Sequence, residues 1–193
     1  MGTSRPRPAR ERLMAAAARR FYADGVTATG IDTITADAGV AKMSLYNNFA
    51  SKADLVNAYL DDRHAEWLEL YRLRLGADTD PRHGVLAVFD AYLDHAAFAY
   101  DHGFRGCGLL NAAAELPVGD AGRAIVAAHK DHVERLIANH LEALLPDRPD
   151  RANRLAEHLS FLLEGAMVRA GLDGDDTRLQ HARSLAVELL EDL

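Results

Sequence analysis

The segment from Ile31 to Leu55 limits what this chain can fold into more than any other part of it. It reads as two short helices joined by a tight turn at Ala38-Gly39-Val40, and a third helix opens at Ser51. Glycine gives the backbone the freedom that such a turn requires. A short helix, a glycine turn and a second short helix with polar tips are typical of the helix-turn-helix, so we expect this motif at about residues 30–49.

Helical spacing of apolar residues extends through almost all 193 residues. Leu13, Ala17 and Phe21 recur at steps of four, which places them on one buried face of a helix. No segment alternates polar and apolar residues for long enough to form a strand. The predicted fold class is therefore all-α with about nine helices, divided into a three-helix DNA-binding head in residues 1–52 and a helical body in residues 53–193.

Polar and proline residues mark where several helices begin or end. Thr29-x-x-Asp32 and Ser51-x-x-Asp54 resemble capping boxes in which aspartate replaces the usual glutamate. Pro81 lies near the start of a further helix, because proline is accepted in a first helical turn. The later helices are predicted at about residues 107–116, 119–145, 150–171 and 176–192.

The net charge of −7 is unexpected for a DNA-binding protein, but the charge is unevenly distributed. Residues 1–52 hold eight Lys or Arg against four Asp or Glu, a net +4, and the remainder holds 14 basic against 25 acidic residues, a net −11. A cationic head on an anionic body directs phosphate attraction to one end. The alternative is a short disordered basic tail on an acidic enzyme. Lys42 and Lys52 disfavour it, since they lie inside the helical motif.

The apolar runs and the cysteine count indicate the cellular compartment. No apolar run approaches the roughly 20 residues that a membrane span needs. Cys107 is the only cysteine, so no intrachain disulfide can form and a reducing compartment is the simplest expectation. We therefore expect a cytoplasmic protein with no membrane partner and no cofactor.

Many residues of the head agree in type and spacing with one family, without a gap over about residues 8–68. They are Phe21-Tyr22-x-x-Gly25, Thr29, Ile31, Ile34, Ala38-Gly39-Val40, Ser44-Leu45-Tyr46, Phe49 and Ser51-Lys52-x-x-Leu55. This pattern resembles the N-terminal head of TetR-family transcriptional regulators. The resemblance implies a homodimer that binds a palindromic operator in double-stranded DNA, usually represses, and releases DNA when a small organic effector enters a C-terminal ligand-binding and dimerisation domain.

The second helix of the motif is predicted to read DNA, with Leu45 and Phe49 turned inward as anchors. The resemblance implies phosphate contacts for Ser44, Tyr46 and Lys52. We expect Lys42, Met43 and Asn47 to contact base edges, because asparagine pairs with adenine and methionine can touch a thymine methyl group. The full predicted DNA-binding set is Thr29, Asp32, Thr33, Lys42, Met43, Ser44, Tyr46, Asn47, Asn48 and Lys52.

Two positions in the head depart from the family pattern. Ala41 stands where relatives often have serine, so the reading helix is expected to lack a side-chain cap, a loss of about 1 kcal/mol. Asp32 stands where some relatives have a cation that reaches DNA. It is expected either to cap the first helix of the motif or to accept a hydrogen bond from a cytosine amino group.

Aromatic and polar residues on otherwise apolar helices are the candidates for an effector pocket, since such pockets combine apolar walls with a few polar groups. The alternative is that these aromatics simply fill the core. The predicted ligand-binding set is Trp67, Tyr71, Phe89, Tyr92, Phe104, Cys107, Leu110, Asn111, Glu115, His129, Phe161 and Met167, and Phe98 is a further candidate.

Three other hypotheses concern reactive or metal-binding side chains. The Gly-Cys-x-x-x-Asn segment at Cys107 resembles one in a subset of the family, some of whose members sense electrophiles through this cysteine. A helix start and Arg105 would stabilise the thiolate, whereas a buried inert thiol is the alternative. His129 and His132 have the spacing of a chelating pair, but no Cys and His cluster supports a metal site. An all-helical enzyme is the weakest hypothesis, because no catalytic set of residues is evident.

The last two helices are apolar on more than one side and therefore need partners. Two copies of this pair form a four-helix bundle around a two-fold axis in the predicted homodimer. The same axis sets two reading helices about 34 Å apart, one for each successive major groove. The predicted stripes are Leu155, Leu159, Leu162 and Ala166 in the penultimate helix, and Leu179, Ala182, Ala186 and Leu189 in the last.

Overall fold

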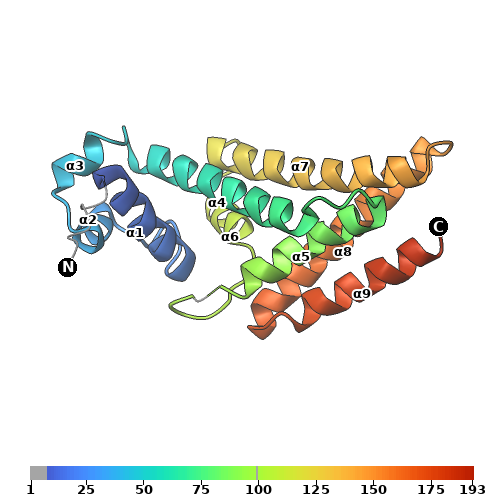
Figure 1. The fold of residues 1–193 in the computed structure, drawn as a ribbon. Helices are drawn as coiled ribbons and strands as arrows, with labels where there is room; N and C mark the ends of the chain where they lie inside the picture. The colour runs from blue at the N-terminus through green and yellow to red at the C-terminus, as the bar shows by residue number, and fades with distance from the viewer. Residues whose placement is uncertain (1–7, 99) are drawn as a thin grey trace, which may run out of the picture. The chain divides into compact units, whose positions relative to one another are not determined.

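The computed structural model describes residues 8–98 and 100–193. These residues form nine α-helices and no strand, which confirms the all-α prediction (Figure 1). Two compact units share the chain. The first holds the described residues up to Arg63 with 100–102 and 108–126, and the second holds 64–98, 103–107 and 127–193. The predicted domain boundary at residue 52 stays a prediction. Arg5 and Arg7, which contribute to the charge of the head, lie outside the described residues.

The first unit contains α1 (Ala9–Ala23), α2 (Ile31–Ala38) and α3 (Lys42–Tyr46). As predicted, Leu13, Ala17 and Phe21 form the buried stripe of α1. This stripe packs against α2 and α3, so three short helices share one small core. Full burial of a large apolar side chain such as Leu13 or Phe21 stabilises the fold by about 1.5–3 kcal/mol.

Gly39 ends α2 as the sequence predicts. Its φ of +60° is in the left-handed region, which glycine enters without a steric penalty. The Gly39 N–H donates to the Ala36 carbonyl (3.1 Å) and the Val40 N–H to the Thr35 carbonyl (3.0 Å). This pair of bonds is the Schellman motif, which fixes the direction in which the chain enters α3.

The two predicted capping boxes have different outcomes. At the start of α4 (Lys52–Leu75), the Asp54 N–H donates to Ser51 Oγ (3.0 Å), which confirms the second cap. The Asp54 carboxylate accepts from the Ala50 N–H (3.0 Å), one residue before the N–H that a standard capping box uses. The first is wrong, because Gly30 is the N-cap of α2 and no side chain caps that helix. The Thr29 hydroxyl donates instead to the Gly25 carbonyl (2.6 Å), four residues back along the chain.

The second unit is built from α5 (Pro81–Ala96), α8 (Pro149–Asp173) and α9 (Thr177–Glu191), together with the later parts of α4 and α7 (Ala121–Leu144). As predicted, Pro81 occupies the first turn of α5, and Asp80 caps that helix by accepting from the Arg82 N–H (2.9 Å). Helix α9 packs against both α5 and α8. The remaining helix, α6 (Gly108–Glu115), falls in the first unit.

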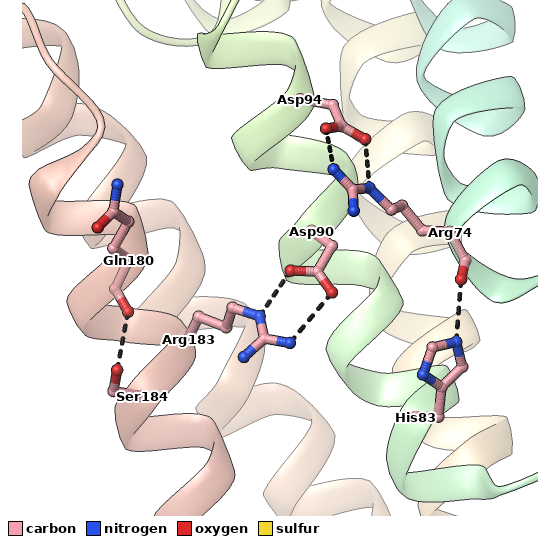
Figure 2. Close-up of polar contacts among 7 residues, drawn as sticks. All are labelled: Arg74, His83, Asp90, Asp94, Gln180, Arg183 and Ser184. Carbon is pink, nitrogen blue, oxygen red and sulfur yellow. Dashed lines mark hydrogen bonds and ion pairs between the residues drawn. The ribbon is translucent and has the colours of Figure 1, made fainter.

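Ion pairs join the helices of the second unit at its surface (Figure 2). Arg183 of α9 donates from Nε to Asp90 of α5 (2.6 Å), and Arg74 at the end of α4 pairs with Asp94 one turn further along α5 (2.6 Å from Nε). His83 bonds through Nε2 to the Arg74 carbonyl (2.9 Å). Bidentate arginine–carboxylate pairs add directional specificity, so they fix how α4, α5 and α9 lie side by side.

The predicted stripes of the last two helices are partly buried within the chain. Leu159 of α8 and Leu179, Ala182 and Ala186 of α9 are buried, so they are not available to a second copy of the chain. The remaining members, Leu155, Leu162, Ala166 and Leu189, are half-buried, and the dimer through these helices stays a prediction. The large apolar side chains that α8 leaves exposed are on a different face. They are Phe161, Val168 and Leu172, with exposed fractions of 66%, 53% and 78%.

Candidate DNA-binding site

Helix α3 is held by two apolar anchors, and its other face is exposed. Leu45 and Phe49 are buried, and the Arg10 guanidinium lies over the Phe49 ring at 4.6 Å. Met43 and Tyr46 are 68% and 48% exposed, although both are large side chains that would normally be buried. Lys42 and Asn47 are exposed beside them. A five-residue helix therefore presents a mixed polar and apolar face while its anchors fix its orientation.

The start of α3 agrees with the expectation for Ala41. This residue is the N-cap in an extended conformation, and no side chain caps the helix. At the other end, the Asn48 side-chain amide donates to the Ser44 carbonyl (2.7 Å) and stabilises the last turn. Asn48 therefore supports α3 from within, whereas Asn47 is exposed to solvent.

Asp32 and Lys42 form an exposed ion pair across the motif, with 2.8 Å between Oδ1 and Nζ. The hydrogen bond to Asp32 raises the pKa of Lys42 above its ordinary value. Of the two expectations for Asp32, the capping of α2 is wrong, because no side chain caps that helix. The base-contact expectation for Asp32 stays a prediction. In the protein without DNA, Asp32 pairs with Lys42, which is itself a predicted base contact.

Other predicted residues lie in or near the loop between α1 and α2. Thr29 is buried and its hydroxyl bonds to the Gly25 carbonyl, so it stabilises the loop from inside rather than facing solvent. Thr33 is exposed on α2. The Lys52 ammonium donates to the Thr27 carbonyl (3.3 Å) at the surface, near the start of α4.

Two arginines of α1 matter more to this site than the sequence indicates. Arg12 donates from Nη1 to the carbonyls of Ala38 (3.2 Å) and Gly39 (3.0 Å), and so holds the turn of the motif. Arg20 donates from Nε to Asp37 of α2 (2.6 Å), which lowers the pKa of that carboxyl. From the sequence both arginines count only as positive charge, because nothing local shows that their partners are 17 to 27 residues away.

Several predicted effector residues meet in the second unit. The Trp67 ring stacks on Tyr71 (centroids 5.9 Å apart) and lies 5.3 Å from the Tyr92 ring and 5.5 Å from the His129 ring. All four side chains are buried, as are Phe89 and Met167. Phe161 is not part of this group, since it lies exposed on α8.

A chain of hydrogen bonds runs from Lys130 through this aromatic group. Lys130 Nζ donates to the Tyr92 hydroxyl (3.3 Å), which bonds to His129 Nε2 (3.3 Å). His129 Nδ1 lies 2.8 Å from His64 Nδ1, and His64 Nε2 lies 3.4 Å from His132 Nδ1. If Tyr92 donates to His129, each histidine in turn donates to the next, so one tautomer assignment satisfies the whole chain.

Burial sets the protonation states of the side chains in this hydrogen-bonded series. It lowers the pKa of His129 to about 2, with the positive charge of Lys130 as the next cause, so His129 is neutral. It also raises the pKa of Tyr92. Burial opposes the charge on Lys130, but Cys107, Tyr92 and Glu164 raise its pKa above the ordinary value, and Glu164 pairs with it at 2.7 Å. The charge of the group is therefore concentrated on Lys130 and Glu164.

Cys107 lies beside the same lysine, with 3.7 Å between Sγ and Nζ, and it is buried, as is Phe104. Leu110 and Asn111 are half-buried on α6 in the first unit. His129 and His132 both bond to His64, and no three His, Cys, Asp or Glu side chains of the described residues are arranged to hold a metal ion.

Glu115, predicted among the effector residues, has a different contact. At the end of α6 its carboxylate accepts from the backbone N–H groups of Val26 (3.1 Å) and Thr27 (2.6 Å). These are the loop residues between α1 and α2. A contact between residues 88 or 89 positions apart has no signature in one sequence, so the sequence offers no way to find it.

An anchored short helix after a left-handed glycine, with a mixed polar and apolar exposed face, is typical of a DNA-binding helix-turn-helix protein. Comparison with known proteins agrees. Residues 13–59 match the family described as bacterial regulatory proteins, tetR family. The crystal structure of a TetR-family transcriptional regulator from Streptomyces coelicolor is 32% identical, with a TM-score of 0.84 and 95% of each chain covered. This chain therefore belongs to the TetR family of DNA-binding transcriptional regulators.

Other relatives agree on the fold or on part of the chain. A TetR regulator from Chloroflexus aurantiacus is 26% identical, with a TM-score of 0.79 over 95% of this chain and 94% of that one. The transcriptional activator FasR of Mycolicibacterium smegmatis is 35% identical over 94 residues. That match spans 48% of this chain and 43% of the activator, so the chain covers less than half of that relative. None of the helices in the described residues is long and apolar enough to cross a membrane.

Proposed function

We propose that this regulator is a homodimeric repressor that binds a palindromic operator and is released by a small organic effector. The observation that carries the DNA-binding part is the geometry of α3, whose exposed face is held in place by buried Leu45 and Phe49. Ser44, Tyr46 and Lys52 are proposed to contact phosphate. We propose that base edges are contacted by Lys42, Met43 and Asn47, and that Thr33 on α2 makes a further DNA contact.

The test is a selection of bound fragments from genomic DNA by the purified full-length chain, followed by gel-shift measurements on the recovered duplex. A recovered site with two half-sites about one helical turn apart supports the proposal. Recovery of no preferred duplex at moderate salt contradicts it. Because the activator FasR shows that a relative can act with the opposite sign, a reporter gene under the recovered operator decides between repression and activation.

The dimer is proposed to form through α8 and α9. The exposed row Phe161, Val168 and Leu172 recurs at steps of seven and four on α8, which places it on one face of that helix. Gly165 lies between them, and a Cβ added there would meet nothing within 4 Å. Three large exposed apolar side chains on one face of a helix support the proposal that a second copy covers this surface. The replacement Phe161→Glu is expected to convert the dimer to a monomer in sedimentation experiments.

The effector is proposed to bind at the group around Trp67, Tyr71, Tyr92 and His129. The indole N–H of Trp67 is buried and meets no hydrogen-bond acceptor among the described residues. A buried donor without a partner costs about 1–3 kcal/mol, which an effector with a carbonyl or other acceptor would recover. Trp67 is the only tryptophan, so its fluorescence reports binding of a candidate effector directly. Candidates that release the operator without changing this fluorescence would contradict the proposed position.

Release is proposed to follow a population shift, in which the effector prefers a conformation whose two heads no longer match the groove spacing. A change from mostly bound to mostly free operator needs a differential affinity of about 5 kcal/mol. The thiol-sensing alternative through Cys107 is not favoured by these comparisons. We further propose a cytoplasmic location and a binding rather than a catalytic role, which the helix-turn-helix head supports.

A further inference from the structure

The loop between α1 and α2 is held by a side chain from a distant helix. The Glu115 carboxylate accepts from two successive backbone N–H groups, those of Val26 and Thr27, at 3.1 and 2.6 Å. A carboxylate is a charged acceptor, and bonds to a charged group are stronger than those between neutral groups. One side chain of α6 therefore fixes two consecutive residues of the loop.

The surroundings of this carboxylate are built to admit it. Gly25 has a φ of +93°, and a Cβ added there would lie 2.6 Å from Glu115 Oε1. Such a contact is closer than real Cβ atoms allow, so the seat of Glu115 exists only because residue 25 has no side chain. At the start of α6, a Cβ on Gly108 would lie 2.9 Å from the Tyr59 hydroxyl oxygen and 3.0 Å from Tyr22 Cδ2. Both ends of α6 are thus in close contact with the head.

The loop that Glu115 holds leads directly into the DNA-binding elements. Helix α2 begins at Ile31, only four residues after Thr27. The Thr29 hydroxyl closes the loop on the Gly25 carbonyl, and the Lys52 ammonium donates to the Thr27 carbonyl. A change in the loop conformation would therefore move both the start of α2 and a predicted phosphate contact.

We propose that Glu115 is a positioning residue for operator binding. It touches no DNA in this scheme; it holds residues 25–29 in the conformation that places α2, α3 and Lys52 on the operator. The inference rests on the proposed DNA-binding function and assigns one further residue to it. Loss of the carboxylate lowers the fraction of heads in the binding conformation, and the apparent dissociation constant rises by the same factor.

The sign of the effect separates this role from simple electrostatics. Glu115 is an acid that contacts a loop of the basic head, so removal of its charge alone would leave DNA binding unchanged or make it tighter. The positioning role predicts that loss of the Glu115 carboxylate makes DNA binding weaker. Exposed Asp61 on α4 belongs to the same unit, and Asp61→Asn removes the same charge without touching the loop. Asp61→Asn is therefore the matched control for Glu115→Gln.

The experiment uses the full-length chain and the duplex that the wild-type protein selects. Glu115→Gln is expected to bind this duplex at least tenfold more weakly than wild type, whereas Asp61→Asn binds equally well or better. Because no phosphate contact is lost, the slope of log affinity against log salt stays unchanged, unlike the loss of about one unit expected for a lysine that contacts phosphate. Glu115→Asp keeps the charge with a shorter reach, and we expect an intermediate loss.

Amide hydrogen exchange gives a readout that does not depend on DNA. In Glu115→Gln the amides of Val26 and Thr27 are expected to exchange faster, while those of α7 and α8 keep the wild-type rates. Binding by Glu115→Gln as tight as that of Asp61→Asn, or unchanged exchange at Val26 and Thr27, would overturn the inference. A wild-type chain that selects no duplex refutes the proposed function itself, so the two failures are distinct.

Discussion

Gly39 offers a quantitative test of how the helix-turn-helix is specified. With φ at +60° and ψ at +42°, it is in the left-handed helical region, which costs a residue with a Cβ about 1–2 kcal/mol. The space around it is sufficient, since an added Cβ would lie 3.7 Å from Arg12 Nη1, an ordinary van der Waals contact. Gly39→Ala is therefore expected to lose about 1–2 kcal/mol of stability from backbone strain alone.

The matched variant is Gly39→Asn, because asparagine enters the left-handed region more readily than alanine. We expect it to lose less than half as much. At the size of this chain, 1 kcal/mol corresponds to about 2–4 °C in Tm, so Gly39→Ala should melt about 2–8 °C below wild type in thermal denaturation followed by circular dichroism. Equal stability of Gly39→Ala and wild type, or equal losses in the two variants, would refute the argument that the turn depends on backbone conformation.

Four further changes test the head and the body. Asp32→Ala removes the partner of Lys42, so the pKa of that lysine should fall toward its ordinary value and gel shifts should show tighter operator binding. Lys52→Ala should weaken binding and reduce the salt slope by about one, in the same assay. Tyr46→Phe should weaken binding with the dimer intact in size-exclusion chromatography. Because the pKa of His129 is about 2 in the folded chain and near 6.5 when unfolded, stability should fall as pH drops from about 6.5 toward 2. His129→Gln should flatten that fall in urea unfolding measured at several pH values.

Local patterns predicted the head well because its key features are local. The apolar spacing of Leu45 and Phe49 shows which face of α3 is buried, and a glycine between two short helices indicates the turn. The box at Ser51 also depends on residues three apart, and the structure contains it. In each case the partners are within a few positions along the chain, so one sequence is enough to pair them.

Features that depend on long-range contacts could not be predicted. Thr29 has the sequence context of a cap, but the loop turns its hydroxyl back to Gly25, and only the three-dimensional path of the chain decides between the two bonds. Phe161 resembles a core aromatic, yet the opposite face of α8 fills the core and leaves it exposed. The roles of Arg12 and Glu115 depend on backbone groups far away in the sequence, and the helical spacing of apolar residues contains no information about such contacts.

The membership of α6 in the first unit bears on how the DNA-binding heads of such regulators could be exchanged. A chimera that joins this head to another C-terminal domain after residue 63 would leave out residues 108–126 and, with them, the side chain that holds the α1–α2 loop. The positioning role proposed for Glu115 predicts that such a chimera binds DNA poorly for a reason unrelated to its recognition helix. A transplant that carries residues 100–102 and 108–126 along with the chain up to Arg63 keeps the whole of the first unit.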